Sequence, residues 1–120
     1  MDVWEVEYTD DFEKWWHDLT EDQQEDVAVG VNLLREIGPS LGRPYVDSVK
    51  GSRHSNMKEL RVQSGGQPLR TFFAFDPRRI AILLIGGCKT GEDRFYEKMV
   101  PLADKLFGDY LREIGQEEGA

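Results

Sequence analysis

The chain has 120 residues, of which 39% are hydrophobic, so it can bury one core but has no room for a second domain. Its formal net charge of −8 is uneven, because residues 1–42 carry −10, residues 43–94 carry +5 and residues 95–120 carry −3. The overall charge argues against general nucleic-acid affinity, whereas the middle block predicts one local basic surface. No apolar run approaches the roughly 20 residues that cross a bilayer. With an acidic start unlike a signal peptide and a single cysteine, Cys88, we expect a cytoplasmic protein without membrane contact.

The first 38 residues predict a strand followed by two helices. Alternation over Val3–Tyr8 is typical of a half-buried strand. Thr9 or Asp10 can cap a short helix. Thr20–Gln23 has the spacing of a capping box that begins a second helix, which Gly38-Pro39 would end. We therefore expect an N-terminal helical hairpin behind the first strand.

The rest of the chain predicts a hairpin, a central strand and a last helix. Residues 39–57 are rich in Gly, Pro, Ser and Asn and predict an ordered loop. Glu59–Gln63 and Leu69–Phe75 read as two strands joined by a turn. Ile80–Ile85 is uninterrupted apolar sequence, as in a strand covered on both faces. The last helix is expected from about Glu92 to Ile114, with one apolar stripe.

Taken in order, these elements predict the α+β class. The expected fold is a small, mostly antiparallel sheet with the N-terminal helical hairpin and a C-terminal helix. Residues 1–114 would form one domain, and residues 115–120 would form a polar tail.

Arg61 and Arg70 lie on the two strands of the expected hairpin. Side chains alternate along a strand, so Arg61 points away from Leu60 and Val62. If the hairpin closes through an even-numbered loop, Arg61 and Arg70 share a face, and with an odd loop they part. Two like charges on one face disfavour folding slightly, which is easier to understand if an anion sits between them. The alternative is that each arginine is salt-bridged or solvated.

Three further residues are candidates for chemistry. Lys89 follows the central strand among glycines that let a backbone approach a phosphate, although the run does not match a Walker loop. His54 lies in the basic loop. Tyr96 is either a half-buried core tyrosine or a base-stacking or acid group at the rim of the basic face. Two distant histidines and one cysteine argue against a metal site, and no cofactor is expected.

Three segments, Lys58–Val62, Leu69–Asp76 and Ile82–Gly91, carry a resemblance to a known family. They supply a Glu-Leu-Arg strand, an arginine-led strand with an acidic turn, and an apolar strand followed by a lysine before a helix. In this order the chain resembles the HigB-like, phage-derived branch of RelE/ParE toxins from type II toxin–antitoxin systems. The resemblance covers nearly the whole chain, from Val3 to about Leu111.

The resemblance implies a RelE-like fold and an endoribonuclease (an mRNA interferase) that cleaves messenger RNA on the ribosome until a helix-turn-helix antitoxin covers it. In metal-free cleavage the 2′-hydroxyl attacks the adjacent phosphate, which requires a base, cations for the phosphorane and an acid. By position, Arg61 and Arg70 would stabilise the phosphorane, and Lys89, or else His54, would move the proton. Tyr96 matches the family more loosely. The expected RNA contacts are Lys50, Arg53, Lys58, Arg78, Arg79 and Arg94.

Two other hypotheses stay open at this point. A ParE-like toxin would bind DNA gyrase and cut nothing, although the arginine and lysine set favours RNA. A catalytically inactive member would serve as a binding partner and use the acidic residues 1–42 as a protein surface. A solvated helical face is the simpler interpretation of that acidic run.

Overall fold

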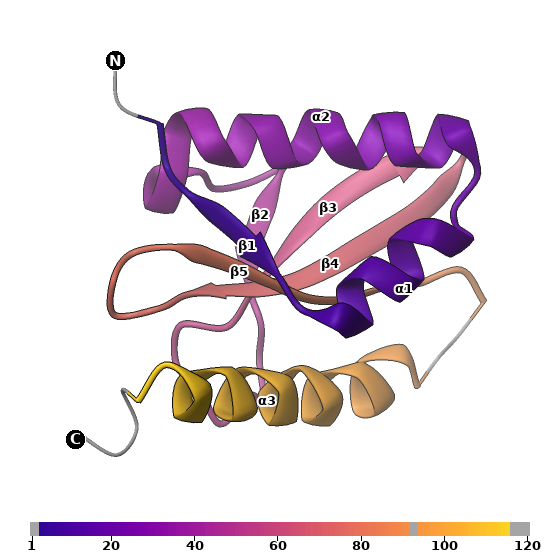
Figure 1. Cartoon of the computed structure of the whole chain (residues 1–120). Coiled ribbons are helices and arrows are strands. Elements are labelled where there is room, and N and C mark those ends of the chain that lie inside the picture. Colours follow the sequence, from indigo (N-terminus) through magenta and orange to yellow (C-terminus); the bar gives the residue numbers. More distant parts are fainter. Residues whose placement is uncertain (1–2, 92–93, 116–120) are drawn as a thin grey trace.

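The computed structural model describes residues 3–91 and 94–115, which form three layers (Figure 1). Two helices cover one face of a five-stranded sheet, and a third helix covers the other face. The expected α+β class is confirmed. The helices are α1 (Asp10–Asp18), α2 (Glu21–Ile37) and α3 (Phe95–Glu113), with a short 3₁₀ helix, η1, over Gly38–Ser40. The strands are β1 (Val6–Tyr8), β2 (Val46–Ser48), β3 (Lys58–Ser64), β4 (Gln67–Phe75) and β5 (Ala81–Cys88).

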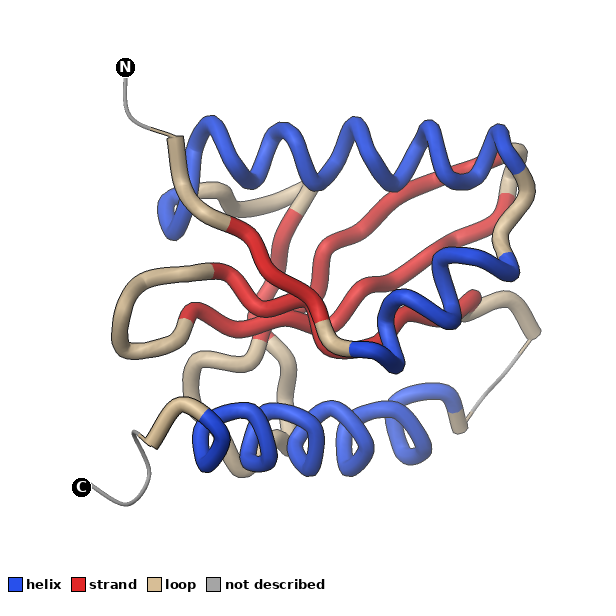
Figure 2. The backbone as a smooth tube through the Cα atoms, in the orientation of Figure 1, coloured by secondary structure: helices blue, strands red, loops and turns tan. Residues whose placement is uncertain are grey.

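The sheet is mixed, with the strand order β1-β5-β4-β3-β2. Strand β1 pairs in parallel with β5, whereas the other three pairs are antiparallel. Figure 2 shows the strands as one red layer between the blue helices. The expectation of a mostly antiparallel sheet is corrected by this parallel edge. Alternation along β1 indicates a strand but does not identify the strand that it pairs with, which lies some 75 residues later in the chain.

The two N-terminal helices begin and end where local signals place them. The Thr9 hydroxyl accepts a hydrogen bond from the Phe12 amide at 3.0 Å and so caps α1. Thr20 and Gln23 form the reciprocal capping box of α2. Helix α2 ends at Gly38, whose φ of 72° lies in the region that favours glycine.

These two helices do not form the expected hairpin. Helix α1 packs on β5, whereas α2 packs on β3. Each helix therefore buries its apolar face on the sheet rather than on the other helix, because the sheet offers the larger apolar surface.

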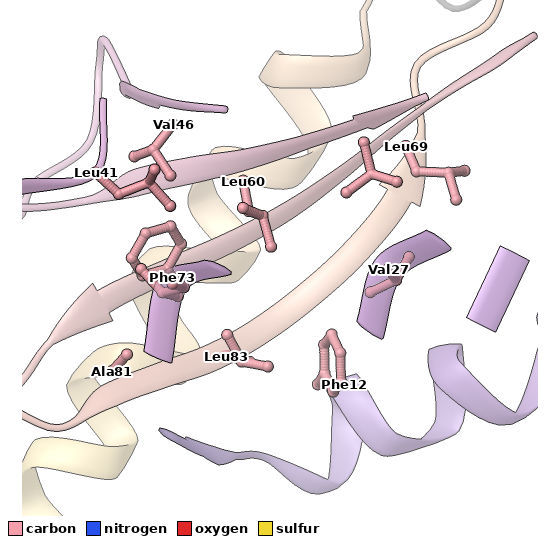
Figure 3. Close-up of a cluster of buried hydrophobic side chains, with 11 residues drawn as sticks. Phe12, Val27, Leu41, Val46, Leu60, Leu69, Phe73, Ala81 and Leu83 are labelled. Atoms are coloured by element: carbon pink, nitrogen blue, oxygen red, sulfur yellow. The ribbon is translucent and has the colours of Figure 1, made fainter. Parts of the chain in front are cut away.

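The main core lies between the sheet and the first two helices (Figure 3). Phe12 of α1 and Val27 of α2 point toward the same apolar face of β3, β4 and β5. That face supplies the buried side chains of Leu60, Val62, Leu69, Phe73, Ala81 and Leu83. A second core packs α3 on the opposite face, around Phe72, Ile82, Leu84, Phe95, Val100, Ala103 and Phe107. Alternate positions of the central strands thus serve two separate cores.

Residues 39–57, which were expected to be a loop, contain η1 and β2. After β2 the chain turns onto α3, where the buried carboxylate of Asp104 holds it. The Ser52 hydroxyl and the Arg53 backbone N–H donate to Asp104 at 2.5 and 2.9 Å. This attachment fixes the position of the basic loop. At the other end of α3, the expected start at Glu92 lies outside the described residues, and the helix begins at Phe95.

Across residues 3–91 and 94–115, none of the helices combines the length and the apolar character needed to span a bilayer.

Gly86 of β5 allows Trp15 of α1 to lie directly on the sheet, since a Cβ at this position would collide with the indole ring. We expect Gly86→Ala to lower the free energy of unfolding by about 1–3 kcal/mol through overpacking. Urea denaturation measures this change. Gly42→Ala is the matched control, because a Cβ there meets nothing within 4 Å, and it should change the value by no more than about 0.5 kcal/mol. Equal midpoints for the two variants would contradict the packing argument.

Candidate active site

Arg61 and Arg70 lie side by side on the face of the sheet that carries α3. Strands β3 and β4 are joined by Gly65 and Gly66, whose φ angles of 56° and 81° suit a two-residue hairpin turn. Because this loop is even, Arg61 and Arg70 are direct cross-strand partners, and such partners share a face. Of the two arrangements that the sequence left open, the structure has the one in which both arginines share a face.

A buried carboxylate, Glu59, lies beside both arginines. It precedes Arg61 by two residues on β3 and so has the same orientation, and it is only 3% exposed. Arg61 donates to Glu59 Oε2 from Nη2 at 3.0 Å and from Nε at 3.2 Å. The Nε atom of Arg70 lies 3.7 Å from Glu59 Oε1. The two like charges are therefore held together by a shared anion of the protein itself.

The start of α3 and the end of β5 bring Tyr96 and Lys89 to the same place. The Tyr96 hydroxyl donates to Glu59 Oε1 at 2.7 Å. The Lys89 ammonium lies 5.4 Å from the centroid of the Tyr96 ring, within cation–π range. Gly87, the partner of Arg70 on β5, lets Phe95 at the start of α3 pack closely on the sheet, because a Cβ there would lie 3.0 Å from the Phe95 ring. Four of the five predicted catalytic residues are thus brought together, and we call them with Glu59 the arginine cluster.

A second carboxylate, Asp47 of β2, borders the arginine cluster. It is the strand partner of Glu59 and forms ion pairs with Arg43 at 3.0 Å and with Arg61 at 3.3 Å. The hydrogen bond from Arg43, together with one from the Ser48 amide, lowers the pKa of Asp47. Asp47 and Glu59 offset only part of the local positive charge, which comes from Arg43, Arg61, Arg70 and Lys89.

The Arg70 Nε–H has an unmet hydrogen-bonding requirement. Among the described residues, Nε of Arg70 is the one buried side-chain nitrogen or oxygen without a hydrogen-bond partner. Its 3.7 Å separation from Glu59 is an ion pair but too long for a hydrogen bond. A buried donor left in this state costs about 1–3 kcal/mol.

Tyr96 is held in its protonated form. Burial raises the pKa of the Tyr96 hydroxyl, and the hydrogen bond and negative charge of Glu59 raise it further, against a smaller opposing effect of Arg70. Each of the raising effects disfavours the tyrosinate anion. The hydroxyl is therefore available as a proton donor at neutral pH.

His54 is not part of the arginine cluster. Its ring packs edge-on against Phe107 of α3, with centroids 4.9 Å apart. Phe107 lies eleven residues after Tyr96, or about 16 Å along the helix axis at 1.5 Å per residue. The Asp104 attachment of the preceding residues accounts for this position. The structure thus brings Arg61, Arg70, Lys89 and Tyr96 together and leaves His54 apart.

The six residues predicted to contact RNA are dispersed. Lys50 and Arg53 are exposed in the loop near α3, and alternation along β3 directs Lys58 to the face opposite Arg61. Arg78 and Arg79 lie in the turn between β4 and β5. There Arg78 pairs with the buried Asp76 and donates to Tyr110, and Arg79 lies over the Trp4 ring. Arg94 precedes α3, two residues before Tyr96, and pairs with Glu97.

Sequence reasoning missed Glu59 and Asp47. Alternation could have placed Glu59 on the same face as Arg61, since the two residues are two positions apart. The sequence did not indicate a role for Asp47, because its strand has only three residues and is too short to give a recognisable alternation. Within the described ranges, no three His, Cys, Asp or Glu side chains group closely enough to hold a metal ion.

Residues 14–108 match the model of a family described as "Phage derived protein Gp49-like (DUF891)". The chain belongs to this family. The matched range includes every residue of the arginine cluster and Asp47 beside it. The family assignment therefore covers the candidate site as well as most of the fold.

Two relatives come from Mycobacterium tuberculosis strain H37Rv. "Putative toxin HigB2" is 42% identical over 114 residues, which cover 91% of this chain and 57% of that protein. "Putative toxin HigB3" is 45% identical over 100 residues, which cover 82% of this chain and 86% of that protein. The chain thus spans a little over half the length of the first relative. The resemblance to the HigB-like branch of the RelE/ParE superfamily is confirmed.

We expect Glu59→Gln to lower the pKa of Tyr96. The substitution removes the negative charge that opposes formation of tyrosinate, so Tyr96 should ionise at a lower pH than in the unaltered protein. Titration of the tyrosinate ultraviolet absorbance measures this shift, and Tyr96→Phe identifies the transition that belongs to Tyr96.

Glu97→Gln serves as the control, because Glu97 is an exposed glutamate on the same helix that pairs with Arg94. It should leave the Tyr96 transition in place. An unchanged transition in Glu59→Gln would show that Glu59 does not control the ionisation of Tyr96.

Proposed function

We propose that this protein is the toxin of a type II toxin–antitoxin pair and acts as a metal-independent endoribonuclease on messenger RNA at the ribosome. The observation that carries the proposal is the pair of adjacent guanidinium groups, one with an unsatisfied buried N–H, beside a protonated tyrosine and a lysine. These are the residue types that cleavage of an RNA phosphodiester without a metal requires.

The proposed chemistry is an attack of the ribose 2′-hydroxyl on its own 3′-phosphate. A base removes the 2′-hydroxyl proton, the new O–P bond forms, and the bond to the 5′-oxygen of the next nucleotide breaks. Arg61 and Arg70 stabilise the phosphorane, since guanidinium groups stay charged and offer planar donor pairs. Tyr96 supplies the proton to the leaving 5′-oxygen, and Lys89, which must first lose a proton to the neutral amine, accepts the proton of the 2′-hydroxyl. His54 has no part in this scheme, because it lies at the far part of α3.

The distribution of charge supports an RNA substrate in spite of the acidic composition. Residues 1–42, which carry a net charge of −10, contribute β1, α1 and α2. Both of these helices lie on one side of the sheet (Figure 1). The strand register places Arg61 and Arg70 on the other face, which carries α3. The sheet therefore separates the acidic helices from the cationic cluster. A polyanion can approach the α3 side without facing the acidic helices directly.

The names of the two relatives support the toxin assignment and suggest the partners. Both relatives are named as HigB toxins, and one matches over most of its length. We extend to this chain the helix-turn-helix antitoxin, the ribosome and the messenger RNA that the family resemblance implies. The binding site of the antitoxin is left open by this proposal.

Expression of the unaltered protein without an antitoxin should arrest growth, and primer extension should show new 5′ ends within translated messages. Arg70→Ala should reduce cleavage by about 10²-fold or more, as when one donor to a developing oxyanion is lost. Lys89→Ala should relieve growth arrest as well, because it removes the proposed base.

Lys14→Ala is the control, since Lys14 is an exposed cation on α1, on the opposite side of the sheet. It should stay toxic, and circular dichroism should show that all variants are folded. Full toxicity of both Arg70→Ala and Lys89→Ala would rule out cleavage through the arginine cluster. Growth arrest with a loss of gyrase supercoiling and no cuts in messages would favour a ParE-like function, and no arrest would favour an inactive binding protein.

A further inference from the structure

Beside the arginine cluster the sheet carries a hollow that the proposed chemistry does not use. Helix α3 packs on β4 and β5, so the part of this face over β2 and β3 is more open. The hollow has a volume of about 560 Å³, which is within the usual range of ligand sites. Its lining consists of Pro44, Tyr45, Arg61, Val62, Gln63, Pro68 and Arg70.

The register of the strands places the lining in two adjacent rows. The backbone carbonyl of Tyr45, just before β2, accepts a hydrogen bond from the Arg61 amide at 2.7 Å. Tyr45, Arg61 of β3 and Arg70 of β4 therefore follow one another across the sheet. The next row joins Gln63 and Pro68, which are also direct partners. An aromatic ring and a proline therefore flank the same two guanidinium groups that are proposed to hold the phosphate.

Tyr45 has the properties of a preformed stacking surface. Its backbone is fixed on both sides, because its N–H donates to Gly42 at 3.0 Å and its carbonyl accepts from Arg61. The residue is nevertheless 49% exposed. In the described part of the chain its ring packs on no other aromatic ring, unlike that of Tyr96, which packs on Phe72 and Phe95. No structural role in either core explains an exposed aromatic ring at this position.

We propose that this hollow binds a nucleobase of single-stranded RNA next to the phosphate held by Arg61 and Arg70. The base stacks on the Tyr45 ring and is enclosed by Pro44 and Pro68, and the exposed amide of Gln63 is placed to form hydrogen bonds with its edge. A nucleotide combines one flat π surface with one phosphate, and unstacked bases are commonly bound on tyrosine rings. This inference rests on the proposed function and adds to it a residue that determines substrate affinity.

The test is cleavage of messages on purified ribosomes under single-turnover conditions, with the protein in excess. The concentration that gives half-maximal rate reports binding, and the maximal rate reports chemistry. Tyr45→Ala should raise the half-maximal concentration by about 5- to 150-fold, as expected for loss of one base-stacking interaction, with a smaller effect on the maximal rate. Tyr45→Phe should stay close to the unaltered protein, because the ring is kept. Thermal unfolding verifies that each variant is folded.

Synthetic messages with one abasic nucleotide, placed in turn at each position of the codon in the decoding site, identify the base. At one codon position, the missing base should raise the half-maximal concentration of the unaltered protein as much as the Tyr45→Ala substitution does. At that position, the missing base should not raise the half-maximal concentration of the Tyr45→Ala variant further. Tyr8→Ala removes a similarly exposed tyrosine at the β1 edge of the sheet and should have no effect.

The inference is overturned if Tyr45→Ala has the same half-maximal concentration as the unaltered protein. It is also overturned if, at every abasic position, the loss of affinity caused by the missing base adds fully to the loss caused by Tyr45→Ala. A selective fall in the maximal rate would also overturn it, since that result would make Tyr45 part of the chemical step. If the unaltered protein does not cut any message, the proposed function itself fails, which is a different result from cleavage that ignores Tyr45.

Discussion

The carboxylate of Glu59 is the constraint on which the candidate site depends. It is buried in the middle of the sheet, where an ionised group is tolerated only with cationic or hydrogen-bonding partners. Arg61, Arg70 and Tyr96 are those partners, and they come from β3, β4 and α3. One charge therefore ties three elements together and fixes the donors that face a substrate. The same charge raises the pKa of the Tyr96 hydroxyl, so Glu59 affects both the position and the acidity of this group.

The separation of acidic and cationic surfaces makes the acidic composition compatible with the polyanionic substrate proposed above. The acidic first third of the chain forms helices on one side of the sheet, and the guanidinium pair projects from the other side. Net charge is thus a poor guide to what this protein binds, because the field near a site depends on the nearest charges and falls off within about 10 Å at moderate salt. Asp47 and Glu59 keep the cluster paired before a phosphate arrives. An incoming phosphate then competes with groups that are already in place.

Local sequence patterns predicted most of the helices and strands, but they did not predict which distant strands and helices pair or pack together. The caps at Thr9 and Thr20 follow from spacing, whereas the sequence left open whether Arg61 and Arg70 share a face, because that depends on the parity of a turn. The partner of β1 and the packing of α1 on the sheet depend on segments far away in the chain. His54 was grouped with the basic loop correctly, but a contact between Asp104 and that loop, which sequence spacing does not reveal, draws it away from the cluster.

The turn at Gly65 and Gly66 links folding and activity more closely than its exposed position suggests. Odd-numbered positions of β3 supply the site, and Leu60 and Val62 between them fill the main core. A single inserted residue at the turn, accommodated by a one-residue slip of β3 against β4, would exchange these two sets. Arginine would then enter the hydrophobic interior while leucine and valine faced water. An insertion at this turn would therefore prevent folding before it could alter activity.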